Sequence, residues 1–154
     1  MTDLGQLVSA LNELYRLSGS AKVHADTVRS TGVQVTQTGL RALSLVSDTP
    51  RISGSDLAAA LDVSQPTASR VLQQLEAEGL VTRHASDTDG RVSHYVVSGK
   101  GGKALEKVRR YHVDRLALAL DGLDDDHRSA LSDAVTELVR LLSQASYSTR
   151  RRTA

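Results

Sequence analysis

Apolar residues near the start of the chain recur at steps of three and four positions: Leu7, Val8, Leu11, Leu14 and Tyr15. This spacing is typical of an amphipathic helix that buries one stripe of its surface. It predicts a first helix from Leu4 to about Ser30, which the Thr31-Gly32-Val33 stretch ends. A second helix, closed by Pro50, is predicted from the apolar residues Leu40, Leu43, Leu45 and Val46.

A capping motif precedes a short third helix. In Ser53-Gly54-Ser55-Asp56, we expect Ser53 to accept a hydrogen bond from a first-turn N–H and Asp56 to reach back. The apolar residues of this helix are Leu57, Ala58 and Leu61. Asp62-Val63 then forms a tight connection to the next helix.

A fourth helix is predicted from about Gln65 to Glu78. Ser64 can cap it, and Pro66 falls in its first turn, where a missing N–H removes no intrahelical bond. Gly79 stands where helices commonly end in the left-handed conformation. At 100° per residue, the apolar residues of the fourth helix share one side, where they can form a small core with the third helix. They are Ala68, Val71, Leu72 and Leu75.

A β-hairpin and two further helices complete the pattern. The β-prone runs 80–84 and 92–97 are separated by Asp87-Thr88-Asp89-Gly90, whose Asp-Gly pair is a strong hairpin signal. A long helix is predicted beyond Gly99 as far as Leu120. A last helix starts near residues 124–126, and its apolar stripe consists of Leu131, Val135, Leu138 and Leu142. Residues 148–154 are expected to be a disordered basic tail.

Length and composition exclude several classes of protein. A chain of 154 residues with 40% hydrophobic and 24% charged residues is expected to form a single globular domain, residues 1–154. Because the chain has no cysteine, it has no disulfide, no zinc–thiolate site and no cysteine nucleophile. No apolar run approaches the ~18 residues that cross a bilayer, so we expect a cytoplasmic protein without a membrane partner.

The charge balance limits how the chain can bind nucleic acid. The formal net charge is only +1, so such binding depends on where the charges lie. With four tyrosines and no Phe or Trp, the chain is poorly suited to stack single-stranded bases. Duplex DNA therefore fits the composition better.

The third and fourth predicted helices form a helix-turn-helix, in which one helix enters the major groove of DNA. The polar side of the fourth helix carries no carboxylate before Glu76, and Arg and Gln suit the edges of guanine and adenine. This side comprises Pro66, Arg70 and Gln73, flanked by Thr67, Ser69 and Gln74. A merely solvated polar face remains the alternative.

The predicted hairpin places Arg91 at or near its tip. An arginine there can enter the adjacent minor groove, and Asp87 or Asp89 can orient it. The alternative is a turn in which Asp and Gly serve backbone geometry and Arg91 is solvated.

The stretch SGSDLAAALDVSQPTASRVLQQLEAEGLVTR, followed by DTDGR and SGKGGKAL, resembles the winged helix-turn-helix of MarR-family regulators. The resemblance implies a mainly α fold with a small β-hairpin wing, in which residues 36–100 form the DNA-binding lobe. Residues 1–35 and 101–147 would form dimerisation helices. The family's wing commonly reads Asp-x-x-Asp-Arg-Arg, whereas Gly90 replaces the first arginine here and leaves Arg91 alone.

The family resemblance and the polar face together give a set of expected DNA-contacting residues: Ser53, Ser64, Gln65, Pro66, Thr67, Ser69, Arg70, Gln73, Asp89, Arg91 and Lys100. The resemblance also implies a homodimer that binds a pseudo-palindromic operator, as a repressor under ligand control. Many family members bind a small anionic or aromatic molecule in a cleft, for which Tyr15, Tyr111 and His112 are candidates; core or interface packing is their alternative role. A winged-helix module that binds only proteins is the alternative function.

Other chemistries find little support in the sequence. Gly99-Lys100-Gly101-Gly102-Lys103 lacks the spacing of a phosphate loop, so we expect a flexible junction that holds Lys100 near the DNA backbone. His84 and His94 can face each other across the hairpin, which is a weak signal for a metal. No catalytic motif is present, and we expect neither an enzyme nor a cofactor.

Overall fold

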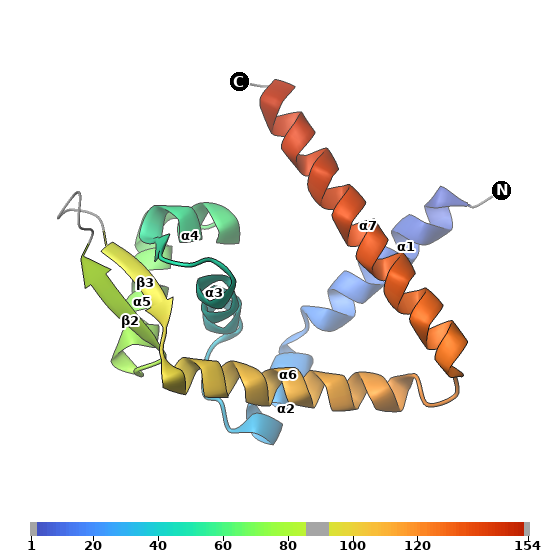
Figure 1. Cartoon of the computed structure of the whole chain (residues 1–154), viewed down its shortest axis with the longest axis horizontal. Coiled ribbons are helices and arrows are strands. Elements are labelled where there is room, and N and C mark those ends of the chain that lie inside the picture. The colour runs from blue at the N-terminus through green and yellow to red at the C-terminus, as the bar shows by residue number, and fades with distance from the viewer. Residues whose placement is uncertain (1–2, 86–92, 153–154) are drawn as a thin grey trace. The chain divides into compact units, whose positions relative to one another are not determined.

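The structure is a computed structural model that describes residues 3–85 and 93–152. Helices dominate these ranges, as Figure 1 shows. Three short strands form one sheet. The elements in chain order are α1 (Leu4–Ser18), α2 (Ala21–Thr31), α3 (Gln37–Asp48), β1 (Ile52–Ser53), α4 (Gly54–Leu61), α5 (Gln65–Ala77), β2 (Val81–Ala85), β3 (Ser93–Val97), α6 (Gly99–Ala119) and α7 (Asp125–Arg152). The predicted fold class is confirmed.

The chain divides into two compact units, Met1–His112 and Val113–Ala154, where a single domain was expected. The first unit contains the sheet and the helix-turn-helix. The second contains the end of α6, a short turn and α7.

The core of the first unit lies between α3, α4, α5 and the sheet. Its largest fully buried side chains are Leu43, Leu57, Leu72 and Leu75. Ala68 is also fully buried, and Val63 and Val71 pack against the same cluster. The predicted core between the third and fourth helices is therefore confirmed, and α3 is part of it.

The sheet contains one strand more than the predicted hairpin. Its order is β1-β3-β2 and all pairs are antiparallel. In β1, Ile52 pairs with Tyr95 and Ser53 pairs with His94. A strand of two residues is too short to show an alternating pattern, so the period of the sequence could not predict it.

The first predicted helix is two helices, so the prediction of one helix to Ser30 is wrong. Gly19 ends α1, and its N–H donates to the carbonyl of Tyr15 at 2.9 Å. The Ser20 hydroxyl then accepts from the N–H of Val23 at 3.2 Å and starts α2. A glycine followed by a capping serine thus interrupts an apolar period that continues on both sides.

The junction between the sheet and α6 is closely packed, whereas a flexible junction was expected. The Ser98 hydroxyl donates to the carbonyl of Gly79 at 2.7 Å and accepts from the N–H of Gly101 at 3.0 Å. Gly101 is buried, and a Cβ built on it would lie 2.1 Å from the backbone oxygen of Leu80. Only glycine lets α6 approach the chain at Leu80 this closely.

In the second unit, Asp124 precedes α7 as predicted for an acidic helix start. Its carboxylate accepts from the backbone N–H of His127 at 2.9 Å and also contacts the His127 ring. These interactions, the backbone hydrogen bond first, hold the pKa of Asp124 below its ordinary value. Residues 148–152, expected in the disordered tail, belong to α7, consistent with the good helix propensity of arginine. Throughout the described ranges, no helix is both long and apolar enough to span a membrane.

We expect Gly101→Ala to lower the free energy of unfolding by about 1–3 kcal/mol, because the new methyl group forces α6 away from Leu80. Gly102→Ala is the matched control, since no atom lies within 4 Å of its added Cβ and alanine favours the helix by up to about 1 kcal/mol. Denaturant unfolding at one protein concentration measures both. Equal stabilities for the two variants would contradict the close-packing explanation.

Candidate nucleic-acid interface

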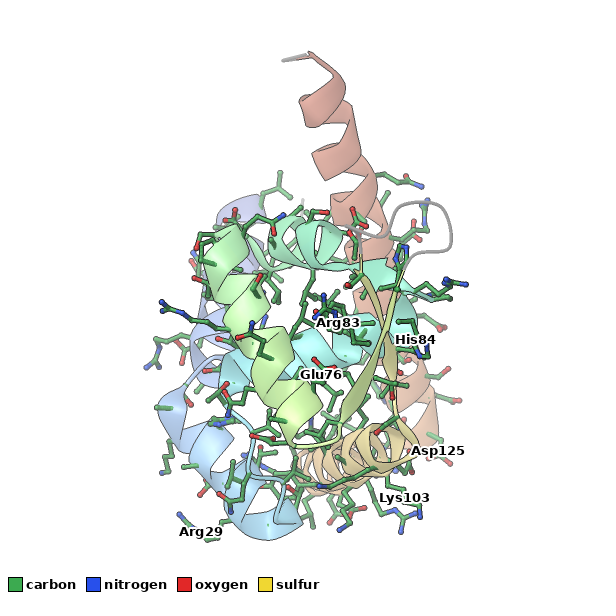
Figure 2. The ribbon with its side chains drawn as sticks, turned by 90° about the vertical axis from the view of Figure 1, so that its left-hand side faces the viewer. Arg29, Glu76, Arg83, His84, Lys103 and Asp125 are labelled. Atoms are coloured by element: carbon green, nitrogen blue, oxygen red, sulfur yellow. The ribbon has the colours of Figure 1, made fainter. Side chains whose placement is uncertain are left out.

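One side of α5 is buried and the other is open to solvent. Ala68, Leu72 and Leu75 face the core. The residues at the start and on the open side of α5 that are expected to contact DNA are all exposed: Ser64, Gln65, Pro66, Thr67, Ser69, Arg70 and Gln73. We call this set the reading face. In Figure 2, α5 lies on the side of the first unit that faces the viewer. The structure therefore brings seven of the eleven expected contact residues together on one surface.

The start of α5 differs from the expected cap. The Ser64 side chain makes no hydrogen bond to a backbone N–H; its hydroxyl lies 2.9 Å from that of Thr67. The N–H groups of the first turn therefore keep their positive end toward solvent, next to the exposed Gln65. Such a helix start favours anionic groups such as phosphates.

The turn between α4 and α5 depends on an unusual backbone conformation. Asp62 has φ +56° and ψ +49°, in the left-handed region that non-glycine residues rarely adopt. The N–H of Val63 donates to the carbonyl of Ala58 at 3.0 Å, which closes the end of α4. This short turn sets the direction in which α5 leaves α4.

Two expected contact residues have structural roles elsewhere. Ser53 is buried, and its hydroxyl accepts from the N–H of Asp56 at 3.1 Å and donates to the Asp56 carboxylate at 2.6 Å. The cap is therefore confirmed, although Asp56 reaches back to the hydroxyl of Ser53. The Lys100 ammonium donates to the carbonyl of Glu78 at 2.7 Å, beyond the last residue of α5. Thirteen residues of helix, about 20 Å, separate that end from the start of the reading face.

The base of the hairpin adds a cation that sequence reasoning missed. Arg83 on β2 is exposed, and its Nε donates to the Ser93 hydroxyl at 2.8 Å across the pair of strands. Figure 2 shows Arg83 and His84 on this hairpin. Arg83 could have been found from the sequence, because it is a positive residue in a predicted strand that leads to the predicted wing. Asp89 and Arg91 lie outside the described residues.

The histidine pair of the hairpin is in register but does not form part of a larger ligand cluster. His84 is opposite His94, as the sequence suggested. His94 Nδ1 lies 2.8 Å from the carbonyl of Arg51, so this nitrogen carries the proton. No group of three or more metal-ligating side chains occurs in residues 3–85 and 93–152.

A separate cleft of about 1220 Å³ lies among α1, α2, α3 and α6 in the first unit. Of the three candidate effector residues, Tyr15 and His112 line it. Tyr111 is half-buried and does not line it; its ring lies beside that of His112, with 5.8 Å between the centroids. We call this space the α1–α6 cleft.

The α1–α6 cleft contains a histidine whose hydrogen bonding is defined. The buried Thr27 hydroxyl donates to the carbonyl of Val23 at 2.8 Å, so toward His112 Nε2, 3.4 Å away, it can only accept. Nε2 of His112 therefore carries a proton, and a neutral ring presents Nδ1 as an acceptor. A bound molecule with a donor group would suit this atom.

The cationic groups of the cleft differ in their pairing. Arg16 and Arg109 form bidentate hydrogen bonds to Glu13 and Glu106, and the bond from Arg109 lowers the pKa of Glu106. Arg41 also lines the cleft, and no ion pair within the described residues involves it. Arg41 is thus the cation best placed to meet an anionic group.

Known proteins match the same region of the chain. A family model described as "MarR family" matches residues 33–92, which include α3, α4, α5 and β2. A crystal structure of a MarR family transcription regulator, SP03579, is 26% identical, with a TM-score of 0.65, and the match covers 93% of this chain and 92% of that one. Residues 33–92 of the chain thus match the MarR family.

Two further relatives of the chain are informative. A putative transcriptional regulatory protein for the hcr operon of Thauera aromatica is 33% identical over 92 residues, 60% of this chain. That match covers 51% of the relative, so it spans about half of its length. FabT of Streptococcus pneumoniae, crystallised in complex with DNA, shares the fold at 19% identity with a TM-score of 0.67, covering 92% of this chain and 99% of FabT.

We expect the backbone conformation at Asp62 to be a measurable constraint on the turn between α4 and α5. Asp62→Gly should retain or raise the free energy of unfolding, because glycine adopts a positive φ without steric cost. Asp62→Val should lower it by about 1–2 kcal/mol, because a branched Cβ clashes in that conformation. Thermal and denaturant unfolding of both variants distinguish the cases, and a stable Asp62→Val protein would show that the turn relaxes.

Proposed function

We propose that this chain is a sequence-specific regulator of transcription that binds double-stranded DNA as a homodimer and represses until a small molecule binds. The observation that carries the proposal is the reading face of α5, which is exposed and free of carboxylates from Ser64 to Gln73. A carboxylate on this surface would repel DNA phosphates. The helix-turn-helix, the hairpin and the match of residues 33–92 to the MarR family model support it.

Arg70 and Gln73 are proposed to read base edges in the major groove. An arginine can donate two hydrogen bonds to guanine, and a glutamine can pair with adenine. Ser64, Gln65 and Thr67 lie at the start of α5, where exposed hydroxyl, amide and backbone N–H groups suit phosphates. FabT, which shares the fold, was crystallised with DNA and supports this use of the fold.

The hairpin is proposed to contact the DNA beside the major groove. Arg83 stands on β2, and its guanidinium uses Nε for Ser93, which leaves the terminal nitrogens to face a phosphate. Arg91, with Asp89, remains the proposed contact in the minor groove. Lys100 and Ser53 are left out of this interface because their polar groups serve α5 and α4.

A second copy of the chain is proposed to cover apolar residues at both ends of the sequence. On α1, Leu4, Val8 and Leu14 are more than half exposed. The second unit exposes a further set: Val113, Leu116, Leu118, Leu123, Leu131, Val135, Val139, Leu141 and Leu142. So much exposed apolar surface is unusual for a monomer and typical of an interface. We propose residues 1–35 and 101–147 as the dimerisation segments.

The α1–α6 cleft is proposed to hold the effector. Arg41 supplies a cation and His112 a defined acceptor, beside the aromatic ring of Tyr15. A small molecule with an anionic group and an apolar or aromatic body fits this lining. Its binding would release DNA if it favours a dimer geometry that cannot span both half-sites.

The first experiment is selection of bound sequences from random duplex DNA at physiological salt. Enrichment of a pseudo-palindrome with half-sites about one helical turn apart is expected for a dimeric helix-turn-helix protein. No enrichment, together with no salt-sensitive binding to any duplex, would contradict DNA binding and favour a module that binds only proteins.

We expect Arg70→Ala to weaken binding to the selected operator by about 1–3 kcal/mol and to relax the preference at one base pair. The control is Arg29→Ala, since Arg29 is equally charged but lies on α2, as Figure 2 shows. Fluorescence anisotropy on matched and single-base-changed duplexes measures both effects. Unchanged affinity and selectivity for Arg70→Ala would remove Arg70 from the interface.

Replacing Leu131, Val135 and Leu142 together by glutamine should yield monomers, because these exposed residues are proposed to pack against a second copy. Light scattering measures the mass, and operator binding should fall with dimerisation. The control is Asp133→Gln with Arg140→Gln, which changes the opposite side of α7 without altering the net charge. A triple variant that stays dimeric would contradict the role of this stripe.

A further inference from the structure

A second depression in the first unit lies at the end of α5 that is remote from the reading face. Its volume is about 580 Å³. The segment Gly32–Val35, Glu78 and Leu80 form part of its lining, and α6 supplies the rest. We call it the basic groove, because three lysines line it: Lys100, Lys103 and Lys107.

The three lysines share one side of α6. Positions 100, 103 and 107 are separated by three and four residues, so their side chains follow each other along about 10 Å of the helix. Lys103 is labelled in Figure 2, well away from Arg83 and His84 on the hairpin. The groove therefore presents a row of ammonium groups on the same helix.

The charges of the groove are poorly balanced by the protein itself. Lys100 donates to the carbonyl of Glu78. Within the described residues, no ion pair involves Lys103 or Lys107. Glu78 contributes the one carboxylate of the lining, and that carboxylate already accepts from Gln74 at 3.0 Å. Two exposed ammonium groups thus remain to meet anionic groups.

The groove also has an apolar floor. Val33, Val35, Leu80 and Ala104 line it, and each is at least nine-tenths buried. A row of cations beside buried aliphatic side chains suits a molecule with charged ends and a short hydrocarbon body. The volume is in the usual range of about 300–1,000 Å³ for small-molecule sites.

We propose that the basic groove binds a small organic dianion with an aliphatic body, such as a dicarboxylate or a phosphonocarboxylate. Lys103 and Lys107 each meet one anionic group, and the hydrocarbon part lies on Val33 and Val35. The groove shares no lining residue with the α1–α6 cleft. The proposal does not depend on DNA binding, because the site is defined by direct binding of the ligand.

The test is NMR titration of the full chain at low salt with glutarate and with 4-phosphonobutyrate. Butyrate, with one charge, and glutaramide, with none, are the control ligands. We expect saturable binding of at least one dianion, at least tenfold tighter than that of butyrate. The amide signals that move should belong to residues 32–35, 78–80 and 100–107.

Lys103→Gln combined with Lys107→Gln should weaken dianion binding at least tenfold. The matched control is Lys22→Gln with Arg29→Gln, which removes the same charge from α2 outside the groove. If the double variant folds poorly, the amide signals that the dianion shifts in the unaltered protein still show whether it binds in the groove.

Three results would overturn the proposal. The first is absence of saturable binding by either dianion, and the second is binding whose shifted signals lie outside the groove. The third is an unchanged dianion affinity in the folded Lys103→Gln/Lys107→Gln protein. If that variant instead binds duplex DNA more weakly with a smaller salt dependence, and no dianion binds, the lysines contact phosphates of DNA and the proposed ligand site does not exist.

Discussion

Burial of the apolar side of α5 is the constraint on which the first unit depends. Leu72 and Leu75 are among the largest fully buried side chains, and they pack with Leu43 of α3 and Leu57 of α4. Because the helix is fixed on this side, its other side can only face solvent. The polar character of the reading face thus follows from how the core is filled.

The sequence predicted the parts of the fold that rest on long periodic patterns or on strong local signals. The core of α4 and α5, the cap at Ser53, the left-handed Gly79 and the acidic start of α7 are all present. The break at Gly19 was missed because the apolar period on both sides obscured a glycine and a capping serine. β1 was missed because its pairing with β3 is a tertiary contact between residues far apart in the sequence.

The candidate site was predictable where exposure follows helix geometry. The polar residues of α5 needed only the helical period to be placed together. Lys100 could not be placed in that way, because its position depends on how closely α6 approaches Leu80 at Gly101. Arg83 required the register of the hairpin, and both cleft residues that were found, Tyr15 and His112, required the packing of α1 and α6.

The contact at Gly101 has a mechanical consequence. Together with the bond from Lys100 to Glu78, it joins the first turn of α6 to residues 78–80, which directly follow α5. α6 has 21 residues and is therefore about 30 Å long. With its first turn held fixed, a tilt of about 10° displaces its far end by about 5 Å by simple leverage. If α5 turns together with α6 about this contact, the same tilt moves the start of α5, about 20 Å away, by about 3–4 Å.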